Sequence, residues 1–319
     1  MWLSSFKAIS WALGRGALCT QHFTAAQFLA VYAAPITPVC AATDGAPAPS
    51  APAAGSAPAA SSDGSSASSG EERRRRGRLE EDAGGPGRML GAWLAKGGFI
   101  MFLVWLLQRP LPGMLRALAY SLALYALLSL IMDGPASLTI GLTGLRVSPH
   151  FDRPWMATTV ASFWSKRWDL AAGNTLRQLI FDSVSEGRLQ ALPRGSPLRQ
   201  PTPARKLLGS TAAFAASGLI HECIFWYLTG HTTHGVWLSF FLSQVPLTVF
   251  ERLALAALKR RGIILPDWLR ALATISLLLP TAYLLFWRPC EQYGVAASAV
   301  ANVKAGLLDA ARALGFSLG

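Results

Sequence analysis

Long apolar blocks, separated by short basic or Pro- and Gly-rich stretches, dominate the sequence after residue 90. A helix needs about 20 predominantly apolar residues to cross a hydrocarbon core of about 30 Å. Blocks near this length predict helices over residues 91–107, 114–132, 207–228, 236–258 and 268–287. The sequence therefore predicts an all-α fold, a polytopic transmembrane helical bundle.

Proline and charge modify this pattern in three places. Residues 109–113 contain two prolines and a glycine, which predict a hairpin turn between the first two helices. Pro246 and the pair Glu251-Arg252 predict interruptions of the fourth block. Residues 294–317 predict a weaker final helix.

The N-terminal segment has two interpretations. The first 43 residues contain no acidic side chain, a bias that organelle transit peptides share. The alternative is a first membrane helix over about residues 17–32, ended by Pro35 and Pro38.

A low-complexity segment follows. Residues 41–70 consist almost wholly of Ala, Pro, Ser and Gly, and residues 71–88 mix acids with four consecutive arginines. Such a segment has too little apolar surface to offset the entropy cost of ordering it. We therefore expect three parts: an N-terminal segment with the first membrane helix at 1–40, a disordered insertion at 41–90 and a membrane domain at 91–319.

Composition and charge agree with a membrane protein. Hydrophobic residues make up 52% of the chain and charged residues only 14%. The net charge of +12 would suggest nucleic acid in a soluble protein, but here the basic residues fall between apolar blocks. There they orient helices and attract anionic membrane lipids or substrates, so we exclude nucleic acid as a partner. The four cysteines form no CxxC pair and are expected to pack as apolar side chains.

Basic loops predict the orientation in the membrane. Residues 146–206 carry ten Lys or Arg and four acids, and residues 259–267 begin with three basic side chains. Both segments are therefore predicted to be cytoplasmic. Within the first, residues 158–181 have helical spacing, with Trp164 and Trp168 one turn apart, which predicts an amphipathic helix at the membrane surface.

An ionisable pair, His221 and Glu222, lies inside the apolar block at residues 207–228. A charged group at the centre of a membrane helix costs about 2.5–3.5 kcal/mol on insertion scales. Because a chain that keeps such groups usually uses them, this block is the first candidate for chemistry.

Two motifs in this part of the chain have a distinctive order and spacing. The first joins Phe151-Asp152-Arg153-Pro154 to Phe163-Trp164-Ser165-Lys166-Arg167-Trp168-Asp169-Leu170. The second is Ser217-Gly218-Leu219-Ile220-His221-Glu222-Cys223-Ile224-Phe225. They resemble the Phe-Asp-x-Pro, Phe-Trp-x-x-Arg-Trp-Asn-Leu and Ser-Gly-Leu-x-His-Glu-x-x-Phe motifs of plant wax synthases, a group of membrane-bound O-acyltransferases. A weaker likeness over residues 7–39 favours the first membrane helix over a transit peptide.

The resemblance implies a long-chain-alcohol O-fatty-acyltransferase. Such an enzyme moves a fatty acyl group from acyl-coenzyme A, its co-substrate, to the hydroxyl of a long-chain fatty alcohol and forms wax esters. The resemblance also implies the endoplasmic reticulum membrane and no further cofactor. Sterol and diacylglycerol acceptors share this chemistry, and a non-catalytic polytopic membrane protein is the alternative from another class.

By the same resemblance, His221 is the catalytic general base. A neutral imidazole can take the proton of a bound hydroxyl, whose oxygen then attacks the thioester carbonyl. The second functional position of the family is the Asn of Arg-Trp-Asn-Leu, which is Asp169 here. Asp169 either donates a hydrogen bond when protonated or orients His221 as a carboxylate, and both roles stay open.

Further candidate substrate contacts are Trp164, Arg167, Trp168 and Glu222. Arg167, with its neighbour Lys166 and with Arg177, is a candidate for the phosphates of coenzyme A, or else forms a basic face at the anionic membrane surface. Glu222 points about 100° away from His221 around the helix, so a structural role suits it equally well.

No metal site is expected. His231 and His234 form a His-x-x-His pair, but the sequence places no Cys or acid close to it. The pair is therefore expected to belong to a polar loop.

Overall fold

The computed structural model describes residues 2–19, 22–38, 86–145, 147–192 and 201–313. Within these residues the regular structure is helical, and the one bridge of β type joins Pro38 to Val147. The all-α prediction is confirmed. Most of the insertion predicted at 41–90 lies outside the described residues, and its last five residues belong to the first long helix.

The long helices follow the predicted apolar blocks. Their bounds are α4 Pro86–Leu107, α5 Gly113–Thr143, α9 Pro203–Thr229, α10 Val236–Arg260 and α11 Asp267–Thr281. After α11, the chain continues through the π-helical η5 Ala282–Trp287 and α12 Arg288–Gln292 to α13 Val295–Ala313.

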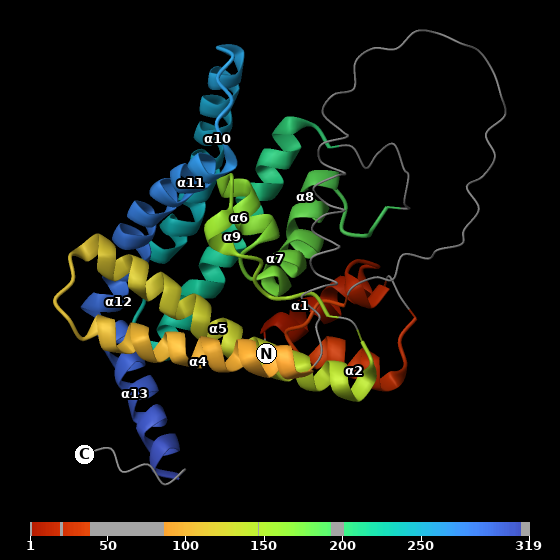
Figure 1. The fold of residues 1–319 in the computed structure, drawn as a ribbon. Coiled ribbons are helices and arrows are strands. Elements are labelled where there is room, and N and C mark those ends of the chain that lie inside the picture. Colours follow the sequence, from red (N-terminus) through yellow and green to blue (C-terminus); the bar gives the residue numbers. More distant parts are fainter. Residues whose placement is uncertain (1, 20–21, 39–85, 146, 193–200, 314–319) are drawn as a thin grey trace, which may run out of the picture.

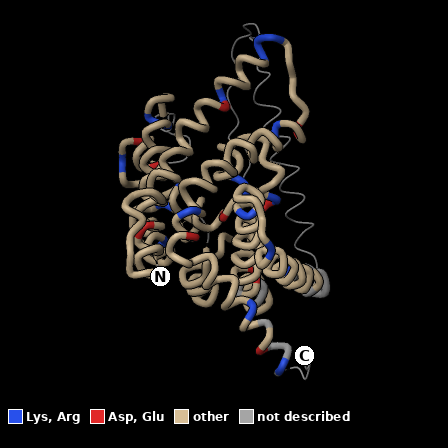
Figure 2. The backbone as a smooth tube through the Cα atoms, turned by 90° about the vertical axis from the view of Figure 1, so that its left-hand side faces the viewer, with Lys and Arg blue, Asp and Glu red and all other residues tan. Residues whose placement is uncertain are grey.

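Four of the described helical stretches are long and apolar enough to cross a membrane. They are Gly113–Thr143, Pro203–Thr229, Val236–Arg260 and Asp267–Gln292. The chain is accordingly an integral membrane protein. Figure 2 shows that charged residues are sparse along these helices, and that basic residues mark the tip of the α10–α11 hairpin.

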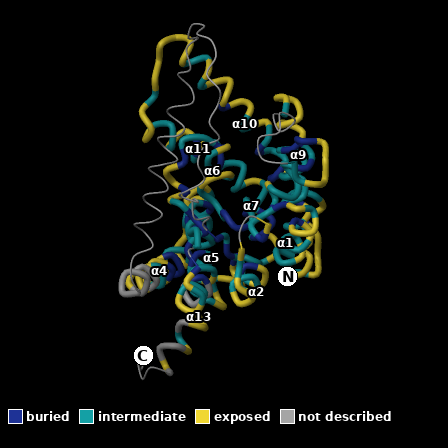
Figure 3. Tube along the Cα trace, turned by 90° about the vertical axis from the view of Figure 1, so that its right-hand side faces the viewer, coloured by how far each residue is buried: buried dark blue, intermediate teal, exposed yellow. Residues whose placement is uncertain are grey.

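Figure 1 shows how the helices are arranged. The pair α4 and α5 lies across the lower part of the molecule, the end of α10 projects at the top, and α13 projects at the bottom. Phe225, Trp237 and Trp287 form the centre of the largest buried cluster, between α9, α10 and η5. Buried positions gather in the middle of the molecule in Figure 3, while the α10–α11 tip is exposed.

The predicted interruption of α10 is wrong, because the helix continues through Pro246 and through Glu251-Arg252. A proline removes one N–H, but packed neighbours allow helices in membranes to tolerate it. Glu251 is only 6% exposed, and its carboxylate accepts hydrogen bonds from the Val160 N–H at 2.7 Å and the Thr274 hydroxyl at 3.0 Å. The buried carboxyl group therefore bonds to the start of α6 Val160–Lys166 and to α11.

The prediction of a first membrane helix over residues 17–32 is also wrong. The chain instead forms α1 Trp2–Ala12, a single 3-10 turn η1 Ala17–Cys19 and α2 Ala25–Ala33, which Thr24 starts with a capping box. None of these elements is long enough to span a membrane. The transit-peptide alternative remains untested.

Arg15 connects the N-terminal segment to residues 186–190 through hydrogen bonds and an ion pair. Its guanidinium donates to Glu186 Oε2 at 2.7 Å and to the carbonyl oxygens of Arg188, Leu189 and Gln190. Both side chains of this ion pair are almost completely buried. The pair therefore joins the turn after α1 to the end of the helical region that precedes α9.

The prediction of a single amphipathic helix over residues 158–181 is wrong, because the helix is broken at residues 167–169. The structure has α6 Val160–Lys166, a break, α7 Leu170–Leu176, the π-helical η3 Arg177–Phe181 and α8 Asp182–Glu186. The break occurs because Asp169 adopts a left-handed backbone conformation, with φ of 37°, and caps α7. This turn brings Asp169 to the central cavity of the helical domain.

Candidate active site

A cavity of about 1040 Å³ lies at the centre of the helical domain. Its lining is mostly apolar and comes from α4, α5, α6, α7, α9, α10, η5 and α13. Helix α9 contributes a stripe that runs almost its whole length, at Lys206, Ser210, Ala213, Ser217, His221, Ile224 and Leu228. From Lys206 to His221 this stripe rises by about 22 Å, at 1.5 Å per residue.

His221 faces the cavity from α9 in a defined orientation. Its Nδ1 lies 2.7 Å from the carbonyl oxygen of Ser217. Because a carbonyl oxygen can only accept, we assign the hydrogen to Nδ1, which leaves the Nε2 lone pair free in the neutral ring. Within the described residues Nε2 has no hydrogen-bond partner. The centroid of the imidazole ring lies 4.3 Å from that of Phe241 and 5.9 Å from that of Trp237, so the surroundings of the ring are apolar.

Asp169 faces the same cavity from the cap of α7. Its Oδ1 accepts a hydrogen bond from the Ala172 N–H at 3.1 Å. Burial raises the pKa of the Asp169 carboxyl, and the Ala172 bond and the nearby His150 offset this only in part. A raised pKa favours the protonated carboxyl, which has an O–H to donate.

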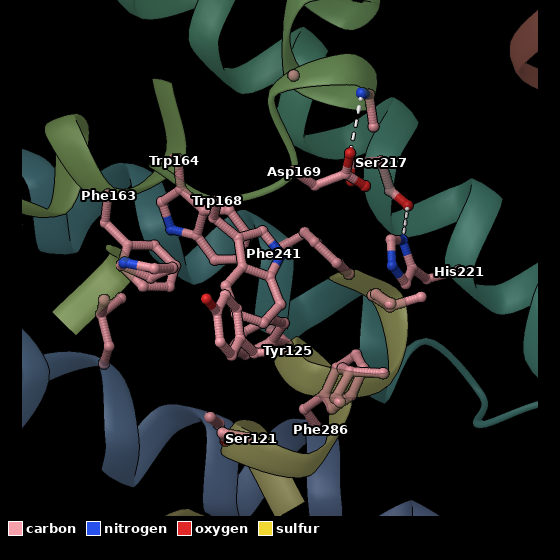
Figure 4. A pocket seen from close by; sticks show the side chains of 18 of the residues that line it. Ser121, Tyr125, Phe163, Trp164, Trp168, Asp169, Ser217, His221, Phe241 and Phe286 are labelled. Atoms are coloured by element: carbon pink, nitrogen blue, oxygen red, sulfur yellow. Dashed lines mark hydrogen bonds between the residues drawn. The ribbon is translucent and has the colours of Figure 1, made fainter. Parts of the chain in front are cut away.

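Figure 4 shows the side chains of Asp169 and His221 at the same part of the cavity. Within the described residues no hydrogen bond joins them, and the Ser217 carbonyl occupies Nδ1 of the imidazole. The ring is therefore oriented by its own helix. Of the two roles left open by the sequence, hydrogen-bond donation by Asp169 fits this geometry and orientation of Nδ1 does not.

Two of the predicted substrate contacts, Trp164 and Trp168, line the cavity, and their ring centroids lie 6.5 Å apart. The Trp164 indole N–H donates to Oε1 of Gln244 at 3.2 Å. Gln244 is completely buried and was not among the candidates, because a single amide within an apolar block gives no motif. It fixes the plane of Trp164, which forms part of the cavity wall.

Arg167 and Glu222 do not line the cavity. Arg167 donates to the carbonyl oxygens of Asp152 and Arg153 at 3.1 and 3.3 Å. Glu222 accepts from the Thr233 N–H and hydroxyl and from the Leu238 N–H, so it holds the loop before α10. These contacts are structural, and the prediction that the two residues touch substrate stays untested.

Three basic side chains line the cavity and are exposed: Arg177, Lys206 and Arg252. None of the three has a side-chain hydrogen bond or ion pair within the part of the chain that is described. Arg177 was a candidate from the sequence, whereas Lys166 lies off the cavity. The sequence did not indicate Lys206 and Arg252 as site residues, because they reach the same cavity only when α9 and α10 pack as a hairpin.

The histidine pair of the α9–α10 loop has other partners. The His231 ring packs against Tyr293, with 5.4 Å between the ring centroids. His234 has a positive φ of 54° in the turn. Among the described residues no group of three or more His, Cys, Asp or Glu side chains is arranged to hold a metal ion.

Comparison with known proteins matches this site to a family. Residues 147–243, which contain both Asp169 and His221, match the membrane bound O-acyl transferase family. This part of the chain is therefore similar to that family.

Several plant proteins named as acyltransferases are similar to this chain. "Probable long-chain-alcohol O-fatty-acyltransferase 8" of Arabidopsis thaliana is 28% identical over 188 residues, which cover 58% of this chain and 52% of that protein. The long-chain-alcohol O-fatty-acyltransferase of Simmondsia chinensis is 29% identical over 122 residues, 38% of this chain and 32% of that protein. "Acyl-CoA--sterol O-acyltransferase 1" of Arabidopsis thaliana is 25% identical over 231 residues, 71% of this chain and 55% of that protein. The chain thus spans about half the length, or less, of these relatives.

Proposed function

We propose that this protein transfers a fatty acyl group from acyl-coenzyme A to the hydroxyl of a long-chain fatty alcohol, forming a wax ester. The observation that carries the proposal is the state of His221. The Ser217 carbonyl holds Nδ1–H, and Nε2 faces an apolar cavity without a protein partner among the described residues. An acceptor nitrogen in this position is what a general base for an alcohol requires.

The chemical step follows from this geometry. Nε2 of His221 takes the proton of the alcohol as the alcohol oxygen attacks the thioester carbonyl carbon. The tetrahedral intermediate then collapses, the C–S bond breaks, and the leaving sulfur of coenzyme A takes the proton from Nε2. The products are the ester and free coenzyme A, and the imidazole returns to its neutral form. An apolar wall disfavours water, which would otherwise hydrolyse the acyl donor.

We assign to Asp169 the role of hydrogen-bond donor to the thioester carbonyl oxygen. In its protonated form, which burial favours, the carboxyl can donate a hydrogen bond to the carbonyl oxygen and to the oxyanion that develops there. Its Oδ1 is already the acceptor for Ala172 N–H. This leaves the second carboxyl oxygen as the donor to substrate.

The basic side chains suit the acyl donor. Arg177, Lys206 and Arg252 line the cavity without protein partners in the described residues, and cations of this kind bind phosphate groups. Lys206 is about 22 Å from His221 along α9, a span comparable to an extended pantetheine arm. Phosphates of coenzyme A at this end would place the thioester near His221.

The apolar remainder of the cavity suits two hydrocarbon chains. It is lined by Val104 of α4, Leu124 and Leu128 of α5, and Val300 and Val303 of α13, all apolar. A sterol is the second candidate acceptor, because the sterol acyltransferase relative aligns over 71% of this chain. We place the reaction in the endoplasmic reticulum membrane on the strength of the wax synthase resemblance.

Expression of the full chain in cells that lack neutral-lipid synthesis tests the proposal. Cells are fed a fatty alcohol, a sterol or neither, and their neutral lipids are separated. Wax esters that form with fed alcohol in the wild type, but not in His221→Ala, are the expected result. Sterol esters alone would shift the proposal to the second acceptor. The absence of any ester, with the protein present in the membrane, would contradict acyl transfer.

A further inference from the structure

His150 is a deeply buried histidine outside the cavity lining, with 2% of its surface exposed. Its Nδ1 lies 3.1 Å from Oδ1 of Asp133 in α5, and its Nε2 bonds to the carbonyl oxygen of Pro35. The imidazole therefore joins the segment after α2 to the middle of the helical domain.

Asp133 is itself held from two further sides. The Ser129 hydroxyl donates to its Oδ2 at 2.7 Å, and Lys96 of α4 bonds to the same oxygen. Asp133, which bonds to the imidazole, therefore connects α4 with α5. Side chains of both helices also form one wall of the cavity.

The main chain of His150 reaches the site. Its carbonyl oxygen accepts from the Leu170 N–H at 2.8 Å, and the Asp152 N–H donates to the Arg167 carbonyl at 2.9 Å. These two bonds bracket Asp169, whose positive φ is a conformation that a non-glycine residue keeps only where its surroundings enforce it.

We propose that His150 is a positioning residue for Asp169: the Asp133–His150–Pro35 bridge fixes the segment whose main chain holds the strained turn that presents the Asp169 carboxyl to the cavity. Loss of the imidazole would release the 150–153 segment from α5 and let this turn relax. The Asp169 carboxyl would then move away from the position that the reaction requires, although no atom of Asp169 had been changed.

The pKa of Asp169 also responds to its surroundings. Burial is the main influence on the Asp169 carboxyl and raises its pKa, while His150 lowers that pKa in part.

The test has an exchange arm and a kinetic arm, both on the full chain in lipid nanodiscs. The exchange arm measures amide hydrogen exchange over residues 167–173 in wild type and His150→Ala. We expect faster exchange in this segment and unchanged exchange in α10. Ser129→Ala is the matched control, because it removes a buried hydroxyl from Asp133 and leaves both His150 contacts in place. Asp133→Leu replaces His150→Ala if that variant does not fold, because Leu has no oxygen to accept a hydrogen bond from His150 Nδ1.

The kinetic arm rests on the proposed function and compares two backgrounds. A displacement of about 1 Å can cost about 10²-fold in rate, so His150→Ala should lower kcat by about 10- to 100-fold. In the Asp169→Ala background the same change should alter kcat by less than about 2-fold, because the residue it positions is gone.

Equal falls in kcat in both backgrounds, or unchanged exchange over 167–173, would overturn the positioning role. If the wild type transfers no acyl group, or the Asp169→Ala rate is too small to measure, the exchange arm alone decides. A failure of the proposed function is thus distinguishable from a failure of this inference.

Discussion

Nδ1 of His221 lies 2.7 Å from the main-chain oxygen of Ser217, one turn earlier on the same helix. The bond makes the orientation of the ring a property of α9 itself, so no side chain from another helix is needed to set it. Asp169, which faces the same cavity from α7, is then available for a different task.

Asp169→Asn should retain or increase acyl transfer. Asn keeps the cap of α7, tolerates the left-handed backbone, and can donate a hydrogen bond at any pH. In the wild type the donor is lost as the pH rises through the raised pKa of the carboxyl, so activity should fall there. Rate–pH profiles of both proteins check this. A variant slower than the wild type at every pH would indicate that the carboxylate itself is required.

The same substitution has a stability consequence. Because burial raises the folded-state pKa of Asp169, the folded protein holds its proton to higher pH than the unfolded chain does. Wild-type stability should therefore fall as the pH rises from the ordinary Asp range through the raised value. Asp169→Asn, which does not titrate, should lack this fall. Parallel loss of stability in both proteins would assign it to other groups.

Lys206→Ala and Arg252→Ala should each raise KM for acyl-coenzyme A by about 10-fold, because each removes a charge-assisted contact worth about 1.5–3 kcal/mol. KM for the alcohol should stay the same. Arg260→Ala is the control, since this arginine ends α10 and does not line the cavity. Steady-state kinetics with each substrate varied in turn decide this. Equal effects on both KM values would speak against a phosphate site.

Arg15→Met should destabilise the folded protein by about 3–5 kcal/mol, because it removes the cation that faces the buried Glu186 carboxylate. Unfolding in detergent, followed by denaturant titration, measures the change. The double variant Arg15→Met/Glu186→Leu should lose less than the single variant. Arg312→Ala, which breaks the exposed pair with Asp309, should change stability by less than about 1 kcal/mol. A similar loss in all three variants would contradict the role given to this pair.

The α9–α10 loop should lie on the side of the membrane opposite to the basic loops. A single cysteine at Thr232, in a chain without its native cysteines, should resist a membrane-impermeant thiol reagent added to intact microsomes. Permeabilised microsomes should label fully. A cysteine replacing Arg261 is the matched probe for the cytoplasmic side. Labelling of residue 232 in intact microsomes would reverse the topology.

The helices of the membrane domain could be predicted from the sequence because each is a long apolar block bounded by Pro, Gly or basic residues. The predicted block at 114–132 was too short, since α5 continues to Thr143 through mildly apolar residues. The break at Asp169 could not be predicted, because helical spacing on both sides hides a turn that only distant contacts stabilise. His150, fastened to Asp133 and Pro35, is such a contact and belongs to no motif.

The candidate site was predicted in part. His221, Asp169, Trp164 and Trp168 were predicted and do line one cavity. Their motifs place them in the chain, but spacing alone cannot reveal that a main-chain carbonyl orients the imidazole. Nor can it show which basic side chains reach the cavity, because that depends on how α9 and α10 pack.

The central claim is that Nε2 of His221 is the general base, and the kcat of purified His221→Ala tests it most directly. Removal of a general base typically costs about 10²–10⁴-fold in rate. We predict a fall in this range, with an unfolding midpoint close to that of the wild type and partial recovery of kcat when free imidazole is added. A His221→Ala protein that transfers acyl groups at the wild-type rate would contradict the account.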